Sequence, residues 1–198
     1  MADMAAEFMR AYDVPGLGVA IVRQGSLVYD EAFGFADKEA GTKLTAAHRF
    51  RIASVSKPIA AVAIFTLIEQ RALGLQDRVF GHNAILGNDF GPVPAGSQLD
   101  QISIEHLLTH TSGGWPNDGN DPMFHYPQLD HSALIASTLK DQPLASQPGT
   151  KYAYSNFGYC VLGRVIEKVT RRSYAGYVRE AVLARAGVWD MECRQRSR

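Results

Sequence analysis

An apolar run extends from Ile59 to Ile68, and Thr66 is its single polar residue. In a helix the run would be apolar on nearly every side, which predicts a helix covered on two sides rather than one at a surface. Its ten residues are about half of what a membrane-spanning helix needs, so no membrane span is expected. Only two or three strands are visible in the sequence, which is few for a sheet that must cover such a helix.

The predicted helix covers residues 54–73, and Gly74 is its expected stop. Pro58 lacks the N–H that would reach the carbonyl oxygen of Ser54. The helix must therefore begin near Ser54 or have a loosened first turn. Either way, the sequence places Ser54 at the entrance of a buried helix.

The segments around this helix predict a mixed fold. A short helix is expected over 2–12, followed by a β-hairpin whose turn is Gln24-Gly25. Strands at the front and helices behind them favour the α+β class over a doubly wound sheet. The length fits one domain over residues 1–198. Further helices are expected over 104–110, 131–140, 156–170 and 173–184, with long loops over 77–101 and 112–127.

The composition excludes several classes of protein. Lys and Arg number 20 and are balanced by 20 Asp and Glu, so the basic surface that a nucleic-acid partner requires is not expected. Apolar residues make up 46% of the chain, which excludes overall disorder. Two cysteines are too few for a disulfide framework.

The segment Ser54-Val55-Ser56-Lys57 is a Ser-x-x-Lys motif at the predicted helix start. Residues three apart lie on one helical face, so the lysine can reach the serine hydroxyl and accept its proton. The same spacing recurs in Ser137 and Lys140, which are expected at an exposed helix end. Spacing alone therefore does not show which of the two serines is reactive. The buried helix that follows Ser54 favours the first copy.

The segment Tyr154-Ser155-Asn156 is expected in a loop between an extended stretch and a helix. In an extended backbone the side chains of Tyr154 and Asn156 point the same way. A phenol near ammonium groups can serve as a base, and an amide can bind a substrate carbonyl. The alternative is an aromatic packing residue followed by Asn156 as a helix N-cap.

His106 and His110 are four residues apart, a spacing that can bind zinc. Glu105 lies outside the pair, so the His-Glu-x-x-His motif is absent. His125 and His131 follow and could approach, but a third ligand is not evident. Two packing histidines are the favoured interpretation, and neither a metal nor another cofactor is expected.

Together, Ser-x-x-Lys at a buried helix and Tyr-x-Asn downstream resemble the serine β-lactamase and penicillin-binding protein superfamily. The nearest likeness is to class C β-lactamases, D-alanyl-D-alanine carboxypeptidases and related esterases. The resemblance implies a β-lactamase-like α+β fold, an antiparallel sheet with flanking helices plus a helical subdomain, and a small-molecule or peptide substrate. The segments that carry it are, in order, 14–16, 50–58, 107–113 and 148–163.

The resemblance also implies roles for individual residues. Ser54 would be the nucleophile of an acyl-enzyme, and its backbone N–H one oxyanion donor. Lys57 and Tyr154 would form the proton-transfer pair, and Asn156 would orient the substrate. Members of the superfamily are often exported, whereas this N-terminus shows no signal-peptide pattern, so a cytoplasmic location is the default expectation.

One element of the superfamily is not found in the 198 residues, a strand bearing Lys/His-Thr/Ser-Gly. The polar and basic ending over 190–198 has no strand pattern either. We therefore expect a family member that is cut short and lacks the C-terminal strands. Two functions follow, a serine hydrolase acting on a β-lactam, peptide amide or ester, or a catalytically silent member with part of the site. The sequence gives no expectation for the oligomeric state.

Overall fold

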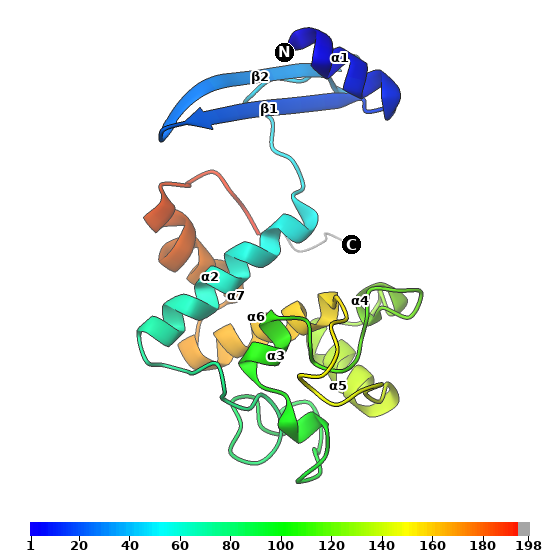
Figure 1. Ribbon diagram of the computed structural model, residues 1–198, viewed down its shortest axis with the longest axis vertical. Helices are drawn as coiled ribbons and strands as arrows, with labels where there is room; N and C mark the ends of the chain where they lie inside the picture. The colour runs from blue at the N-terminus through cyan, green and yellow to red at the C-terminus, as the bar shows by residue number, and fades with distance from the viewer. Residues whose placement is uncertain (194–198) are drawn as a thin grey trace. The chain divides into compact units, whose positions relative to one another are not determined.

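The computed structural model describes residues 1–193 and divides into two compact units, Met1–Arg51 and Ile52–Arg198. The first unit contains a three-stranded sheet and one helix, and the second contains a group of helices joined by long loops (Figure 1). This content is the α+β class that the sequence predicts. The prediction of one domain over residues 1–198 stays a prediction, and residues 194–198 of the polar ending lie outside the described residues.

The first unit is built on the predicted β-hairpin. Its antiparallel strand order is β1-β2-β3, and β1 and β2 are joined through Gln24 and Gly25. Both turn residues have positive φ, 50° and 77°, which matches the twist of the paired strands. The hairpin prediction is confirmed. The elements are α1 (Ala2–Ala11), β1 (Gly16–Arg23), β2 (Ser26–Asp37) and β3 (Thr42–Lys43).

Two glycines let β1 and β2 approach closely at the open end of the hairpin. Gly16 pairs with Gly34, which has a φ of 78°. A Cβ atom on Gly16 would overlap the carbonyl oxygen of Phe35, and one on Gly34 would overlap that of Pro15. Only glycine fits such a close backbone contact.

The second unit contains the predicted helices and one that the sequence analysis missed. The helix α4 lies inside the segment expected to be a loop, because Asp121 caps it and Pro122 occupies its first turn. The helices are α2 (Ser56–Glu69), α3 (Ile104–Leu108), α4 (Pro122–His125), α5 (His131–Asp141), α6 (Asn156–Thr170) and α7 (Tyr174–Val178). Shorter turns of 3-10 helix are η1 (Ala53–Val55), η2 (Leu99–Gln101) and η4 (Ala184–Ala186), and η3 (Arg179–Leu183) is a π-helix.

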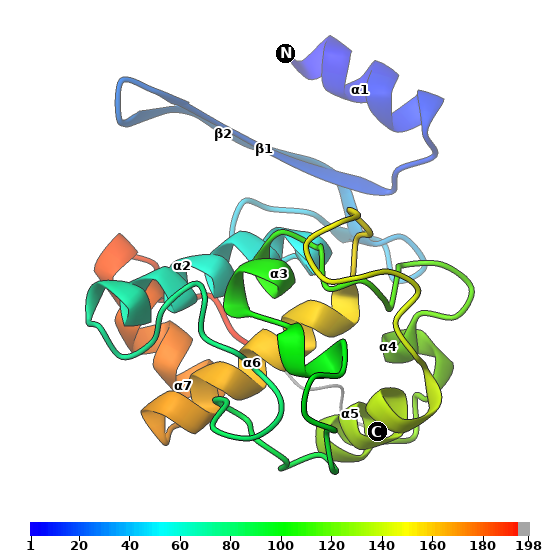
Figure 2. The same cartoon turned by 60° about the horizontal axis from the view of Figure 1, so that its bottom comes forward.

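The helix α6 forms the centre of the second unit, where it contacts α2, α3, α4 and α7 (Figure 2). Its apolar residues recur at helical spacing, so one broad face can be buried. Five of them have no exposed surface, namely Phe157, Val161, Leu162, Val165 and Ile166. This packing fixes the direction of α6 and hence the place of its first residues.

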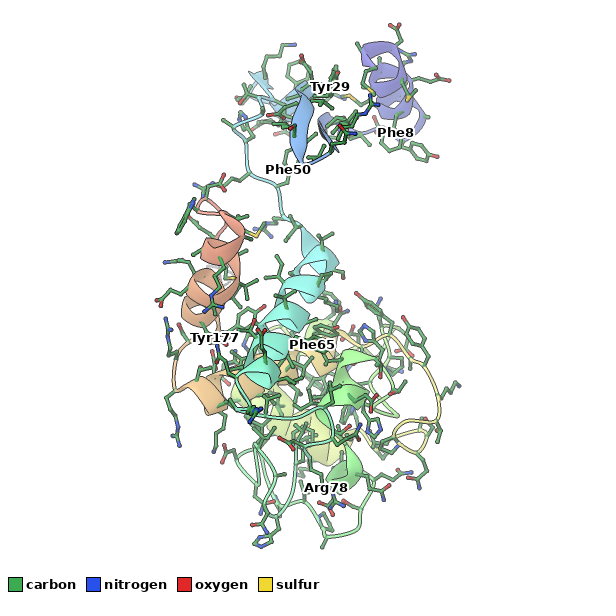
Figure 3. The ribbon with its side chains drawn as sticks, turned by 60° about the vertical axis from the view of Figure 1, so that its left-hand side comes forward. Phe8, Tyr29, Phe50, Phe65, Arg78 and Tyr177 are labelled. Atoms are coloured by element: carbon green, nitrogen blue, oxygen red, sulfur yellow. The ribbon has the colours of Figure 1, made fainter. Side chains whose placement is uncertain are left out.

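The helix α2 buries one face and exposes the other. Ala63 and Ile64 have no exposed surface, whereas Val62 and Phe65, the latter labelled in Figure 3, are each 51% exposed. Within its own unit, α2 is therefore packed on one side, and the prediction that its other side is also covered stays a prediction. The helix also ends at Glu69 rather than near residue 73, because Arg71 adopts a left-handed backbone with a φ of 57°.

None of the helices within residues 1–193 is both long and apolar enough to cross a lipid bilayer.

Two substitutions in α2 test this packing. Ile64→Ala should lower the free energy of unfolding by about 2–5 kcal/mol, because it leaves a cavity in the core. Val62→Ala on the exposed face should change it by no more than about 0.5 kcal/mol. Urea unfolding followed by circular dichroism measures both. Equal losses for the two variants would contradict the one-sided burial of α2.

Candidate active site

Ser54 lies in the short turn η1, immediately before α2. The predicted loosening of the first turn is confirmed, because a 3-10 turn precedes the α-helix that contains Pro58. Ala53 has a φ of 43°, which is rare for a residue with a side chain. Its carbonyl oxygen accepts a hydrogen bond of 2.6 Å from the Ser56 hydroxyl, and this bond stabilises the turn that presents Ser54.

Asn156 is the first residue of α6, and the cap before it is Ser155. The hydroxyl of Ser155 is buried and accepts a hydrogen bond of 3.0 Å from the N–H of Gly158. The alternative of Asn156 as the helix N-cap is therefore wrong. Because Ser155 takes that role, the amide of Asn156 is available for other contacts.

The ammonium group of Lys57 is the point at which the four predicted residues meet. Lys57 Nζ donates hydrogen bonds to Ser54 Oγ at 3.1 Å and to Asn156 Oδ1 at 2.6 Å. It also lies 4.6 Å from the centre of the Tyr154 ring. The structure thus brings together Ser54, Lys57, Tyr154 and Asn156.

Some neighbours of Tyr154 raise the pKa of its phenol and others lower it. Burial raises the pKa of Tyr154, and the charge of Asp121 raises it further. Hydrogen bonds with Lys57 and Ser54, together with the positive charge of Lys57, lower it by more. The pKa of Tyr154 therefore lies below its ordinary value of about 10, which makes the phenolate more accessible.

Two further residues hold the amide of Asn156, and the sequence analysis did not find them. Asn156 Nδ2 donates to Asn117 Oδ1 at 3.0 Å and to Asp121 Oδ2 at 2.8 Å. The carboxylate of Asp121 is buried, and its Oδ1 accepts the N–H of Met123 at 2.9 Å. An Asp-Pro pair signals a helix start, but the contact of Asp121 with Asn156, 35 residues away, has no local signal.

The two histidines considered for zinc make backbone contacts instead. His106 Nδ1 accepts the N–H of Ser103 at 3.2 Å, as part of the cap of α3. His110 Nδ1 accepts the N–H of Ser155 at 3.0 Å, and its ring stacks on that of Tyr154. Within residues 1–193, no group of three or more metal-ligating side chains comes together.

The second Ser-x-x-Lys lies in the last turn of α5, as predicted. The hydroxyl of Ser137 donates to a carboxylate oxygen of Asp141 at 3.2 Å, and Lys140 is exposed. The same spacing thus produces a different set of contacts. Ser137 is a natural control for Ser54.

With this geometry established, known proteins provide a comparison. Among curated proteins the chain is 30% identical over 192 residues to esterase EstB of Burkholderia gladioli. The alignment covers 92% of this chain and 48% of EstB. The chain is also 27% identical over 165 residues to Protein flp of Staphylococcus aureus, in an alignment that covers 83% of this chain and 32% of that protein. The chain therefore spans about a third of the length of Protein flp and about half of that of EstB.

Solved structures show the same likeness. The octameric penicillin-binding protein homologue from Pyrococcus abyssi matches with a TM-score of 0.76 and 29% identity, over 94% of this chain and 42% of that one. The D-alanine carboxypeptidase AmpC from Burkholderia cenocepacia matches with a TM-score of 0.73 and 26% identity, over 92% and 46% of the two chains. The Beta-lactamase family model matches residues 1–197, and the chain belongs to the Beta-lactamase family.

Proposed function

We propose that this chain carries the acyl-transfer site of a serine hydrolase, with Ser54 as the nucleophile. The substrate would be a β-lactam, a peptide amide or an ester. The observation that carries the proposal is the position of Lys57 Nζ, within hydrogen-bond distance of both Ser54 Oγ and Asn156 Oδ1. An esterase and a carboxypeptidase among the similar proteins support hydrolysis of ester and amide bonds.

In the proposed reaction the phenolate of Tyr154 takes the proton of the Ser54 hydroxyl, while Lys57 stabilises the phenolate by charge and hydrogen bonding. Ser54 Oγ then forms a bond to the substrate carbonyl carbon, and the bond to the leaving group breaks. Tyr154 returns its proton to the leaving group. Water hydrolyses the resulting acyl ester and regenerates Ser54.

Asn156 would orient the substrate and Lys57 together. Its amide oxygen faces Lys57, and its amide nitrogen faces Asn117 and Asp121. A carboxylate only accepts hydrogen bonds, so Asp121 holds the nitrogen end of the amide on its own side. This arrangement prevents the amide from turning its N–H groups towards the ammonium of Lys57.

A second function is favoured by one observation. The superfamily's Lys/His-Thr/Ser-Gly segment is not found in these 198 residues. The resemblance assigns that segment the other oxyanion donor, and losing one donor lowers the rate about 10²–10³-fold. The alternative is therefore a chain that retains the nucleophile and its partners but is catalytically silent.

Covalent labelling separates the two functions. A fluorescent penicillin, a chromogenic cephalosporin and a short-chain nitrophenyl ester should each be tried, and intact mass spectrometry should find one acyl adduct. Ser54→Ala should abolish the adduct, and Ser137→Ala should retain it, because Ser137 contacts Asp141 rather than a base. No adduct on the wild type with any probe would support the silent chain.

Replacing Tyr154 by Phe tests its proposed role as the base. Acylation should slow by about 10²–10⁴-fold, the usual contribution of a positioned acid or base. In the wild type the rate should rise with pH as the phenol deprotonates, with a midpoint below the ordinary value of about 10. Stopped-flow pH profiles should show that Tyr154→Phe loses this rise. Tyr12→Phe, at an exposed position, is the control, and an unchanged profile in Tyr154→Phe would refute the role.

Asp121→Asn tests how the amide of Asn156 is held. The variant must place an N–H group against either Asn156 or the N–H of Met123, so a partly buried donor loses its acceptor. The free energy of unfolding should fall by about 1–3 kcal/mol, and acylation should slow. Asn117→Ala removes an exposed acceptor and should cost no more than about 0.5 kcal/mol. Chemical denaturation with Asp121→Asn as stable as the wild type would contradict this account.

A further inference from the structure

His110 makes one contact with the ring of Tyr154 and one with each of the two residues beside it. Its ring stacks on the Tyr154 ring, with centroids 4.5 Å apart. Its carbonyl oxygen accepts the N–H of Ala153 at 2.8 Å, and its Nδ1 accepts the N–H of Ser155 at 3.0 Å. One residue thus fixes the side chain of Tyr154 and the peptide groups on both sides of it.

The backbone of His110 is specialised for this position. Its φ of 59° lies in the left-handed region, where His and Asn are enriched among residues with side chains. This backbone lets the carbonyl oxygen and the ring of one residue reach two neighbouring segments. His110 also follows α3, which packs against α6, so its position is anchored in the core.

We propose that His110, in its neutral form, is the positioning residue that holds Tyr154 against Lys57, and that protonation of its ring releases Tyr154. The consequence for catalysis rests on the proposed function. The protonation state of His110 and its contacts with Tyr154 and Ser155 do not depend on the proposed function, so they can be tested separately.

The hydrogen bond at Nδ1 determines which form of the ring fits. An acceptor nitrogen carries no proton, so the neutral ring must carry its proton on Nε2. Burial lowers the pKa of His110, and the charge of Lys57 lowers it further. The pKa therefore lies below the ordinary value of about 6.5, so the ring is neutral above that pH. As the pH falls through the lowered pKa, the ring gains a proton and Nδ1 can no longer accept.

The titratable groups around the ring explain why protonation would disturb the site. Lys57 lies at the start of α2, Tyr152 and Tyr154 lie in the segment before α6, and Tyr159 lies in α6. A charged ring would add a second cation beside Lys57. It would also set an N–H at Nδ1 against the N–H of Ser155.

Two substitutions separate the acceptor from the ring. His110→Asn keeps an acceptor oxygen near the place of Nδ1 and tolerates the left-handed backbone, but it cannot ionise. His110→Phe keeps an aromatic ring and loses the acceptor. A purely structural role for the ring would make Phe the milder change, whereas the proposed role makes Asn the milder one.

The first experiment needs no activity. Nitrogen-15 NMR of the full chain should show His110 with an unprotonated Nδ1 and a protonated Nε2 at pH 7, assigned by the loss of its signals in His110→Asn. Its titration midpoint should lie below about 6.5, and Lys57→Met should raise it. The Ser155 amide proton should shift with the same midpoint. A proton on Nδ1 at pH 7, or a midpoint at or above 6.5, would overturn the proposal.

The second experiment measures acylation against pH with whichever probe labels Ser54. Because the rate already falls with pH as Tyr154 is protonated, the wild type should show a second, steeper fall with the midpoint found for His110, and His110→Asn should lose only this second fall. At neutral pH, His110→Phe should be slower than the wild type by about 100-fold, as for a catalytic group misplaced by about 1 Å. The same second fall in His110→Asn would refute the catalytic consequence. If no probe acylates the wild type, the proposed function fails while the NMR result still decides the state of His110.

Discussion

The contact of one ammonium group with two oxygen atoms is the interaction on which the candidate site depends. Lys57 Nζ reaches Ser54 within its own helix start and Asn156, 99 residues further along the chain. The first contact follows from the spacing of three residues at a helix start. The second requires the whole second unit to fold, because only packing can bring the beginning of α6 beside the beginning of α2.

The core provides that packing. The fully buried face of α6 fixes the helix against α2 and α3, so the N-terminal ends of α2 and α6 can share one lysine. Close-packed interiors are stiff. The stiffness of the apolar core therefore keeps the hydrogen-bond distances around Lys57 constant, although the core itself contributes no polar contact to the site. In this unit the site is therefore a consequence of an apolar helix interface.

Around the four predicted residues lies a layer of polar groups that hold them. Asp121 and Asn117 hold the amide of Asn156, and His110 holds the ring and the flanking peptides of Tyr154. These residues come from the loop after α3 and from the start of α4, where backbone conformation is irregular. The positive φ of His110 and the cap that Asp121 makes are local, but the site residues that they contact are remote in sequence.

Periodicity or spacing within a short segment was enough to predict the hairpin, the spans of α5 and α6, and the contact of Ser54 with Lys57. The choice of Ser155 over Asn156 as the cap of α6 and the contact of Ser137 with Asp141 are also local, but several neighbouring partners compete for each. The packing of whole helices decided which face of α2 is buried in its unit. It also brought Asp121 and His110 into the site. Contacts between residues far apart in sequence are set by the packing of whole helices, and no local pattern records that packing.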